Sequence, residues 1–212
     1  MSKKLRVLSF AMFLALFIFF TLSACGGIRY SQVSPSAGDF HPKTIGVLPV
    51  DVGTYGEARG VADQIISGIL VEKGWFSDVA SPERVRSQMA YNADLRKAVV
   101  DYLTKLKTVN FSDPELSKKI GEYYKIDAFL IVNVDFWNYT TQGKDKVAKV
   151  GFAAKLVDAE TGKIMWEAGH HEVKDLKQNL EPNWQLFAKM SIFDEDFRFL
   201  MLPLPLTLNA EP

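Results

Sequence analysis

Cys25, the only cysteine in the 212-residue chain, carries the side chain best suited to covalent chemistry. Its thiol is a nucleophile that an enzyme can alkylate. Ser23 and Ala24 stand directly before it and are small enough to let a peptidase reach the backbone. A nearly continuous apolar run from Val7 to Leu22 precedes them, after a basic start made of Lys3, Lys4 and Arg6. This order indicates a targeting segment that is removed from the folded protein.

The sequence Leu22-Ser23-Ala24-Cys25 resembles a bacterial lipobox. The resemblance implies cleavage before Cys25, a diacylglycerol on its sulfur and an acylated new N terminus. Two or three acyl chains hold a protein on a bilayer where one does not. Gly26 stands where an aspartate would retain a lipoprotein in the inner membrane, so the resemblance implies an outer-membrane anchor on the periplasmic face. The alternatives are an ordinary secretory signal and an uncleaved anchor, because about twenty residues can cross a bilayer.

The composition excludes several classes of function. Removing residues 1–24 takes away three of the 25 basic residues and none of the 25 acidic ones, which leaves 22 against 25 and a formal charge of −3. Such a chain has no basic footprint for nucleic acid. With Cys25 lipidated no free thiol remains, which excludes thiol catalysis and a cysteine-based metal site. The remaining 188 residues suffice for one hydrophobic core without disulfides or metal.

We predict three parts: a signal peptide at 1–24, a lipidated tether at 25–42 and a single periplasmic α/β domain at 43–212. The tether is rich in Gly, Ser and Pro, and its seventeen residues from 26 to 42 would extend at most about 60 Å. The domain opens with a strand at 44–50, a helix whose apolar stripe ends at Gly74, and a strand at 75–79. This order predicts a βαβ unit.

Three more helices are expected to cover one face of the sheet. The first begins at Ser81-Pro82-Glu83, the second spans 92–107, and the third runs from a capping box at 112–115 through Lys125. Strands at 127–132, 147–157 and 163–167 follow, the last two joined by a loop at 158–162 in which Gly162 can supply a positive φ. A final helix is expected around 184–191. We therefore predict a two-layer or three-layer sandwich, with a mixed sheet that combines the βαβ unit with an antiparallel meander.

Four segments together resemble a family of periplasmic lipoprotein domains, those related to the curli secretion protein CsgG and the cell-wall synthase activator LpoB. They are the strand 45–50, the helix after it, the strand Lys125–Val132 and the run Leu156–Glu167. The resemblance covers 43–173, and its most specific part is the hairpin at 158–166. It implies an α/β sandwich without a catalytic site. The loop 138–146 is too short for two membrane-spanning strands of about nine residues, and the tether is shorter than that of synthase activators.

Other residues with chemical potential favour structural interpretations. His170 and His171 are adjacent on a strand, so they point to opposite faces and cannot both bind one metal; His41 lies in the tether. The segment 52–56 has the glycines of a phosphate loop without its Lys-Ser/Thr, and we interpret it as a turn. No Gly-x-Ser-x-Gly occurs, and Asp194-Glu195-Asp196 is interpreted as a solvated cluster. We predict no catalytic residue, metal or cofactor.

Two aromatic groups are candidates for binding a partner. Trp137 and Tyr139 follow the central strand and are alternatively ordinary core or edge aromatics. The apolar tail 197–206, with Phe199 and Leu202, either packs on its own domain or meets a partner or membrane. The leading interpretation is a non-catalytic outer-membrane lipoprotein that binds an envelope protein, or itself, in envelope biogenesis or export. The alternatives are a ring-forming component of a secretion complex and a periplasmic hydrolase.

Overall fold

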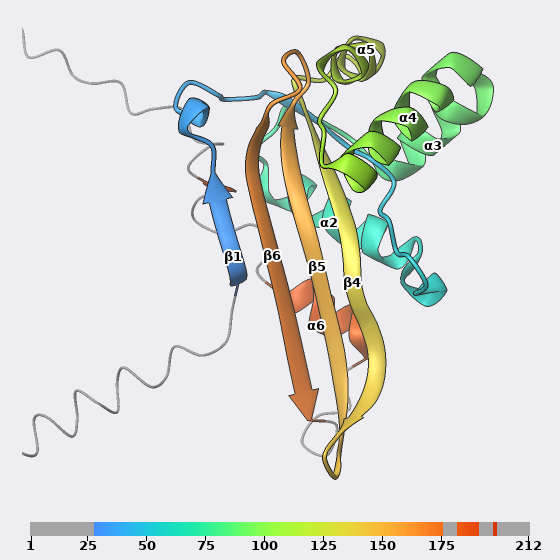
Figure 1. Cartoon of the computed structure of the whole chain (residues 1–212), viewed down its shortest axis with the longest axis vertical. Helices are drawn as coiled ribbons and strands as arrows, with labels where there is room; N and C mark the ends of the chain where they lie inside the picture. The colour runs from blue at the N-terminus through green and yellow to red at the C-terminus, as the bar shows by residue number, and fades with distance from the viewer. Residues whose placement is uncertain (1–27, 176–181, 191–196, 199–212) are drawn as a thin grey trace, which may run out of the picture.

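The computed structural model describes residues 28–175, 182–190 and 197–198. These residues form a six-stranded mixed sheet with helices packed on it, which confirms the predicted α/β class (Figure 1). The strand order is β1-β6-β5-β4-β2-β3. The strands are β1 (Ile28–Val33), β2 (Thr44–Val47), β3 (Asp78–Ala80), β4 (Ala128–Gln142), β5 (Asp145–Asp158) and β6 (Ile164–Asp175). The helices are α2 (Val61–Lys73), α3 (Pro82–Tyr91), α4 (Ala93–Val109), α5 (Pro114–Tyr124) and α6 (Asn183–Lys189), with 3-10 turns η1 (Pro35–Ala37) and η2 (Gly56–Ala58).

The predicted βαβ unit is present, because β2 and β3 pair in parallel on either side of α2. Ala62, Ile66 and Leu70 of α2 are fully buried, one turn apart, and Gly74 ends the helix in the left-handed conformation with φ 63°. The strand expected at 75–79 starts later, at Asp78. The three residues before it return the chain from the helix to the sheet.

One buried carboxylate ties this unit together. Asp63, in the first turn of α2, is 1% exposed. It accepts a hydrogen bond from the backbone N–H of Val50 at 3.0 Å and an ion pair from Arg86 of α3 at 2.8 Å. A buried charge is tolerated only when it is paired and hydrogen-bonded, and Asp63 has both kinds of partner. It fixes the loop after β2 against two helices.

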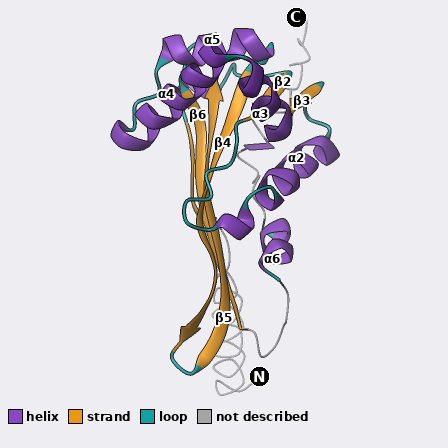
Figure 2. Cartoon of the chain, turned by 90° about the vertical axis from the view of Figure 1, so that its right-hand side faces the viewer, coloured by secondary structure: helices purple, strands orange, loops and turns teal. Residues whose placement is uncertain are grey.

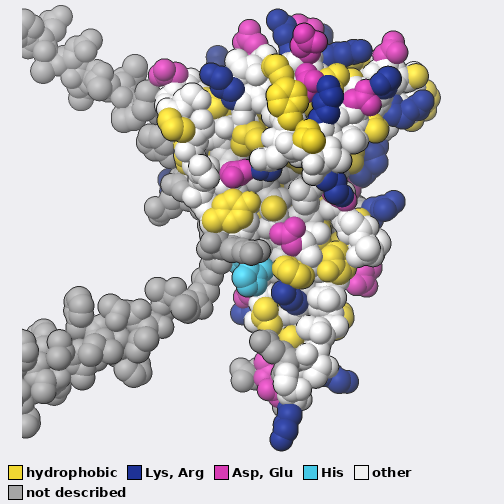
Figure 3. Space-filling model, viewed as in Figure 1, with side chains coloured by type: hydrophobic (Ala, Val, Ile, Leu, Met, Phe, Trp, Pro, Cys, Tyr) yellow, Lys and Arg dark blue, Asp and Glu magenta, His cyan; other side chains and the backbone are white. Residues whose placement is uncertain are grey.

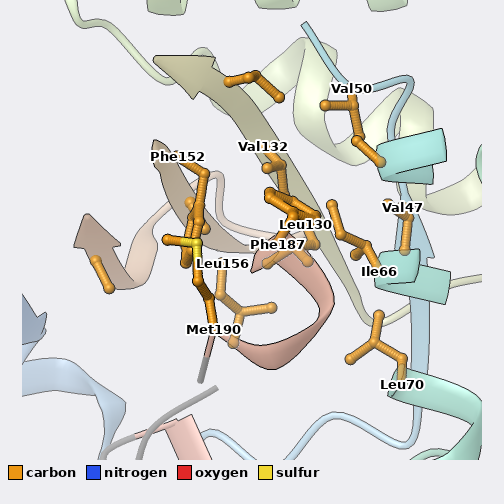
Figure 4. Packing of buried hydrophobic residues seen from close by; sticks show 14 of the residues in the cluster. Val47, Val50, Ile66, Leu70, Leu130, Val132, Phe152, Leu156, Phe187 and Met190 are labelled. Carbon is orange, nitrogen blue, oxygen red and sulfur yellow. The ribbon is translucent and has the colours of Figure 1, made fainter. Parts of the chain in front are cut away.

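The helices cover both faces of the sheet, which selects the three-layer form of the sandwich (Figure 2). One core cluster lies between the sheet and α2 with α6, where Ile66, Leu130 and Phe187 point toward one another (Figure 4). The other lies between the opposite face and α3, α4 and α5, around Tyr102 and Phe129, whose rings meet edge to face at 5.2 Å. The predicted helical block therefore does cover one face.

The predicted antiparallel meander is present, but its strands are longer than expected. The sequence suggests a loop at 138–146. In the structure, β4 and β5 continue through this segment as a hairpin, closed by a two-residue turn at Gly143, with φ 64°, and Lys144. Polar residues interrupt the apolar alternation here, so the strands are set by pairing with each other rather than by burial.

The sheet begins at Ile28, within the segment that the sequence assigns to a tether at 25–42. Strand β1 pairs antiparallel with β6, from Ile28 opposite His170 to Val33 opposite Trp166. The hydroxyl of Ser31 accepts a hydrogen bond from Nε1 of Trp166 at 3.2 Å. The strand has weak apolar alternation and a partner 135 residues away along the chain, so no local pattern indicates it.

Helix capping matches the sequence at one site and differs at another. Ser81 caps α3 as predicted, accepting from the N–H of Arg84. At α5 the N-cap is Asp113, which accepts from the N–H groups of Glu115 and Leu116, so the expected cap at Ser112 is wrong. The hydroxyl of Ser112 instead donates to the carbonyl of Gly162. The side chain that could cap the helix is thus used to hold the loop between β5 and β6.

Candidate interaction site

The far ends of β4, β5 and β6 form a three-stranded extension that we call the blade, residues 135–142, 145–152 and 170–175. It projects beyond the part of the sheet that β2, β3, α4 and α5 cover (Figures 1 and 2). Helix α6 packs on one side, which we call the α6 face. Among the described residues no helix lies on the other side, the open face. Among the described residues, the blade therefore has one face of the sheet that no helix covers.

A β-bulge at Asp135 marks where the blade begins. The pairing of β4 with β5 shifts by one residue between Val134 and Phe136. Before the bulge, the carbonyl of Val132 accepts from the N–H of Asp51, and the N–H of Val134 donates to the carbonyl of Asp51. Even-numbered residues therefore direct their backbone groups away from β5 in that part of the strand. The extra residue reverses this parity.

Beyond the bulge, odd-numbered residues direct their N–H and C=O groups away from β5. The two-residue turn leads independently to the same set of outward residues. The two residues that flank such a turn form backbone hydrogen bonds with each other, and every second residue along the strand then does the same. Gln142 opposite Asp145 is the flanking pair. The outward-directed set is Trp137, Tyr139 and Thr141. Within the described ranges, no strand pairs with β4 on this side beyond Val134.

The two outer edges of the blade differ in charge. The exposed edge of β4 from Phe136 to Gln142 contains no charged residue, no proline and no glycine. The edge of β6 beyond His170 carries Glu172, Lys174 and Asp175. Natural sheets protect open edges with charged side chains, prolines and bulges. The edge of β6 is protected by charge, whereas the edge of β4 beyond the bulge at Asp135 has neither charge nor proline and is open to pairing.

The structure separates the two aromatic residues predicted to bind a partner. Trp137 is 4% exposed and packs on Phe187 of α6, with ring centroids 5.4 Å apart, which is the position of a core residue. Tyr139 is 54% exposed, and its hydroxyl accepts a hydrogen bond from the backbone N–H of Asn183 at 3.3 Å. Tyr139 is therefore both accessible and held in place. The other predicted positions, Cys25, Phe199, Leu202 and the cluster 194–196, lie outside the described residues.

Two aromatic rings lie close to glycines on the open side of the sheet. A Cβ at Gly151 would come within 2.9 Å of Cδ2 of Phe136, and a Cβ at Gly169 within 2.6 Å of Cε1 of Tyr30. The ammonium of Lys149 sits 3.4 Å from the centre of the Phe136 ring. Hydrophobic side chains lie between charged ones on this face (Figure 3). The face is a partly apolar surface of the kind found at non-obligate interfaces.

His170 and His171 lie on opposite faces, as their adjacency predicts. His170 is buried on the α6 face, where its ring stacks on Phe152 with centroids 6.0 Å apart. Burial lowers the pKa of His170 below its usual value, partly opposed by Glu172. The neutral imidazole is thus a packed ring of the core. Within the part of the chain that the structure describes, no three metal-type side chains come together.

Two hollows lie elsewhere on the domain, and each contains a carboxylate with a structural role. The larger, about 710 Å³, lies between residues 39–42, the end of α5 and the loop 158–160. Its Asp127 accepts the N–H groups of Lys43 and Thr44. The smaller, about 210 Å³, lies between α4 and β4 and is below the usual size of a ligand pocket. Asp51 at its rim pairs with Lys107 at 2.6 Å.

The segment 52–56 is a turn, as predicted. The carboxylate of Asp51 accepts the N–H of Gly53, whose φ is 50°. Lys107 and this N–H hold the pKa of Asp51 below its usual value. The charge of Asp51 is therefore neutralised by groups of its own domain.

None of the helices in the described ranges is both long enough and apolar enough to cross a membrane.

No family model matches this chain, and no curated protein matches it. It is similar to the lipoprotein GNA1162 of Neisseria meningitidis, with 19% identity over 64% of this chain and 85% of that one, at a TM-score of 0.46. It is similar to PelC, solved as a dodecamer, of Paraburkholderia phytofirmans, with 16% identity over 83% and 95% and a TM-score of 0.49. It is similar to the hypothetical protein CT253 of Chlamydia trachomatis, with 8% identity over 63% and 73% and a TM-score of 0.38. These identities and scores are low, and the function proposed next rests on the residues of this chain.

Proposed function

We propose that this protein is anchored by lipid to the outer membrane, faces the periplasm, and serves as a non-catalytic binding or assembly module in envelope biogenesis or export. The observation that carries the proposal is the blade, which projects from the core with one face that no helix of the described residues covers and with an uncharged edge on β4. A projecting sheet of this kind offers backbone groups and a partly apolar surface to a protein partner.

The anchor is supported by the order of residues around Cys25. A basic start, an apolar run and the small residues Ser23 and Ala24 lead to the one thiol of the chain. The thiol becomes the site of alkylation, and the domain remains outside the bilayer.

A non-catalytic role is supported by how the polar side chains of the domain are used. Asp63 and Asp127 bind backbone N–H groups, Asp51 pairs with Lys107, and His170 is stacked in the core. Each of these groups has a structural partner that accounts for its position. Catalytic carboxylates and imidazoles instead face a space where a substrate can reach them.

A ring-forming component of a secretion complex is the second candidate. Its specific support is that the blade has an outer edge on each side, one on β4 and one on β6. Two different edges allow copies to pair head to tail, and such an arrangement closes into a ring when the rotation between copies permits.

The anchor is tested by Cys25→Ala. We expect an unprocessed precursor that keeps residues 1–24, seen as a larger mass on electrophoresis, because the thiol needed for alkylation is gone. Ser23→Ala is the matched control, because it puts another small residue two positions before Cys25 and should be processed normally. An unchanged mass and unchanged detergent partition of Cys25→Ala would contradict the lipoprotein assignment.

The binding role is tested by placing a photo-crosslinking residue on the blade in cells. Val173, on the open face, is 41% exposed, and Val71, on the outer side of α2, is 65% exposed. We expect a crosslink to a distinct envelope protein from position 173 and not from position 71. Identical crosslinks from both positions, or none from 173, would show that the open face is not a binding surface.

A further inference from the structure

We propose that the open edge of β4 pairs with the same edge of a second copy, so that two blades join across a two-fold axis into one continuous six-stranded sheet. This inference rests on the binding role proposed above and names the occupant of one of its surfaces. The pairing uses the backbone of Trp137, Tyr139 and Thr141, which the bulge at Asp135 directs outward.

One register satisfies all of the outward groups. When two copies run antiparallel with Tyr139 opposite Tyr139 of the second copy, Trp137 of each copy lies opposite Thr141 of the other. Each of these three pairs can exchange two N–H···O=C bonds, about six in all. A shift by one residue would face outward groups with inward ones, and a shift by two residues would keep the alternation but pair only two of the three outward residues of each copy. The register centred on Tyr139 therefore forms the most hydrogen bonds.

The side chains are compatible with the same register. On the α6 face, the exposed Tyr139 meets its own copy, an aromatic pair of the kind that stabilises sheets, while Trp137, opposite Thr141, is already covered by Phe187 and contributes its backbone. On the open face, Phe136 lies opposite Gln142, and Asn138 lies opposite Thr140. No charged residue occurs in the paired segment, so no like charges meet across the axis.

The β4 edge of a second copy fits this edge better than the outer edge of β6 would. The outer edge of β6 would bring Glu172, Lys174 and Asp175 against a strand that offers no opposite charge. The edge of β4 is its own neutral complement. Identical neutral edges give the self-matching surface that a two-fold dimer requires.

The edge is also prepared for pairing before it meets a partner. The Tyr139 hydroxyl is bonded to the N–H of Asn183, and Trp137 packs on Phe187, so α6 fixes both side chains. The strand is held on its inner side by β5 along its whole length. Little ordering is therefore needed when the dimer forms, which lowers the entropic cost of association. In the dimer both open faces lie on the same side and form one larger surface.

The inference is tested on the full-length protein in mild detergent by sedimentation over a range of concentrations. We expect the mass of a dimer. Thr141→Pro removes an outward N–H, which an edge strand tolerates, and should raise the dissociation constant about tenfold or more while the monomer stays folded. Thr140→Pro is the parity control: it removes an N–H directed at β5 and should lower the free energy of unfolding.

A covalent readout keeps the test independent of folding effects. In a chain with one native cysteine, Tyr139→Cys would place two thiols opposite each other at a Cα separation suited to a disulfide. We expect an oxidised dimer from Tyr139→Cys and none from Val71→Cys.

Three results would overturn the two-fold pairing. They are a monomer at all concentrations, a dimer that neither Thr141→Pro nor Tyr139→Cys affects, and a large ring whose crosslinks join β4 to β6. The proposed function has a separate readout. If the dimer is absent and position 173 still crosslinks to an envelope protein, the binding role stands and the pairing fails. If the dimer forms and position 173 gives no crosslink to an envelope protein, the pairing stands and the proposed binding role fails.

Discussion

Gly162→Ala is expected to lower the free energy of unfolding by about 3 kcal/mol, because the new methyl group meets backbone and the residue has a positive φ. Gly162 has φ 71°, and a Cβ there would lie 2.7 Å from Cα and 3.1 Å from N of Pro114. Pro114 begins α5, so relief of the clash requires the helix to move away from the loop between β5 and β6. Urea unfolding followed by circular dichroism measures the loss.

Gly143→Ala is the matched control for this substitution. Gly143 has a similar φ, 64°, but nothing lies within 4 Å of its Cβ position. Only the conformational cost applies, so we expect a loss of about 1 kcal/mol. Equal losses of unfolding free energy at both positions would show that the contact with Pro114 costs no stability and that α5 moves to relieve it.

Trp166→Ala is expected to lower the free energy of unfolding by about 4 kcal/mol, within the usual range for removing a large aromatic side chain from a core. Trp166 is fully buried, its ring meets that of Phe197 edge to face at 4.8 Å, and its Nε1 donates to the hydroxyl of Ser31. The substitution would leave a cavity and remove the hydrogen bond to Ser31 of β1. The measurement is again urea unfolding.

Two further variants separate packing from hydrogen bonding. Trp184→Ala removes a half-exposed tryptophan of α6 and should cost about 1 kcal/mol. Trp166→Phe keeps most of the ring contact and loses the bond to Ser31. Hydrogen exchange of the β1 amides should therefore accelerate in Trp166→Phe more than the global stability falls. If Trp166→Ala lowers the free energy of unfolding no more than Trp184→Ala does, the packing of Trp166 does not contribute the stability expected of a core residue.

Sequence reasoning works where burial sets the pattern. The stripe of α2 and the strands that cross the core consist of apolar residues at the period of their element, because one side of each faces the interior. The helix end at Gly74 and the turn at Gly162 can also be predicted, since each glycine takes a positive φ that other residues avoid. These features depend on residues near one another in the chain.

The parts that sequence reasoning missed depend on distant partners. Strand β1 is set by Trp166 and Gly169, far along the chain, and the cap of α5 moved to Asp113 because Ser112 bonds Gly162. No local pattern reports such choices. The blade mixes polar and aromatic residues, so its strands are invisible to a search for apolar alternation.

The candidate site could be predicted only in part, because it too depends on residues that are distant in the chain. Trp137 and Tyr139 drew attention as aromatics, and their spacing of two places them on one face. Helix α6 then covers one and leaves the other exposed, which no local pattern indicates. The signal that could have indicated the edge is the absence of charge from Phe136 to Gln142. The bulge that decides which backbone groups point outward has no sequence signature here.

The early start of the sheet has a mechanical consequence. In the proposed lipid-anchored form, only two residues, Gly26 and Gly27, separate Cys25 from Ile28, so that about 10 Å of extended chain joins them. With so little slack, tension between the membrane and the domain acts on the end of β1 and passes through its pairing with β6 before it reaches the core. Drag on a bound partner would be resisted first by the few hydrogen bonds of one short strand, and β1 sets the force at which this strand leaves the sheet and lengthens the covalent link to the lipid.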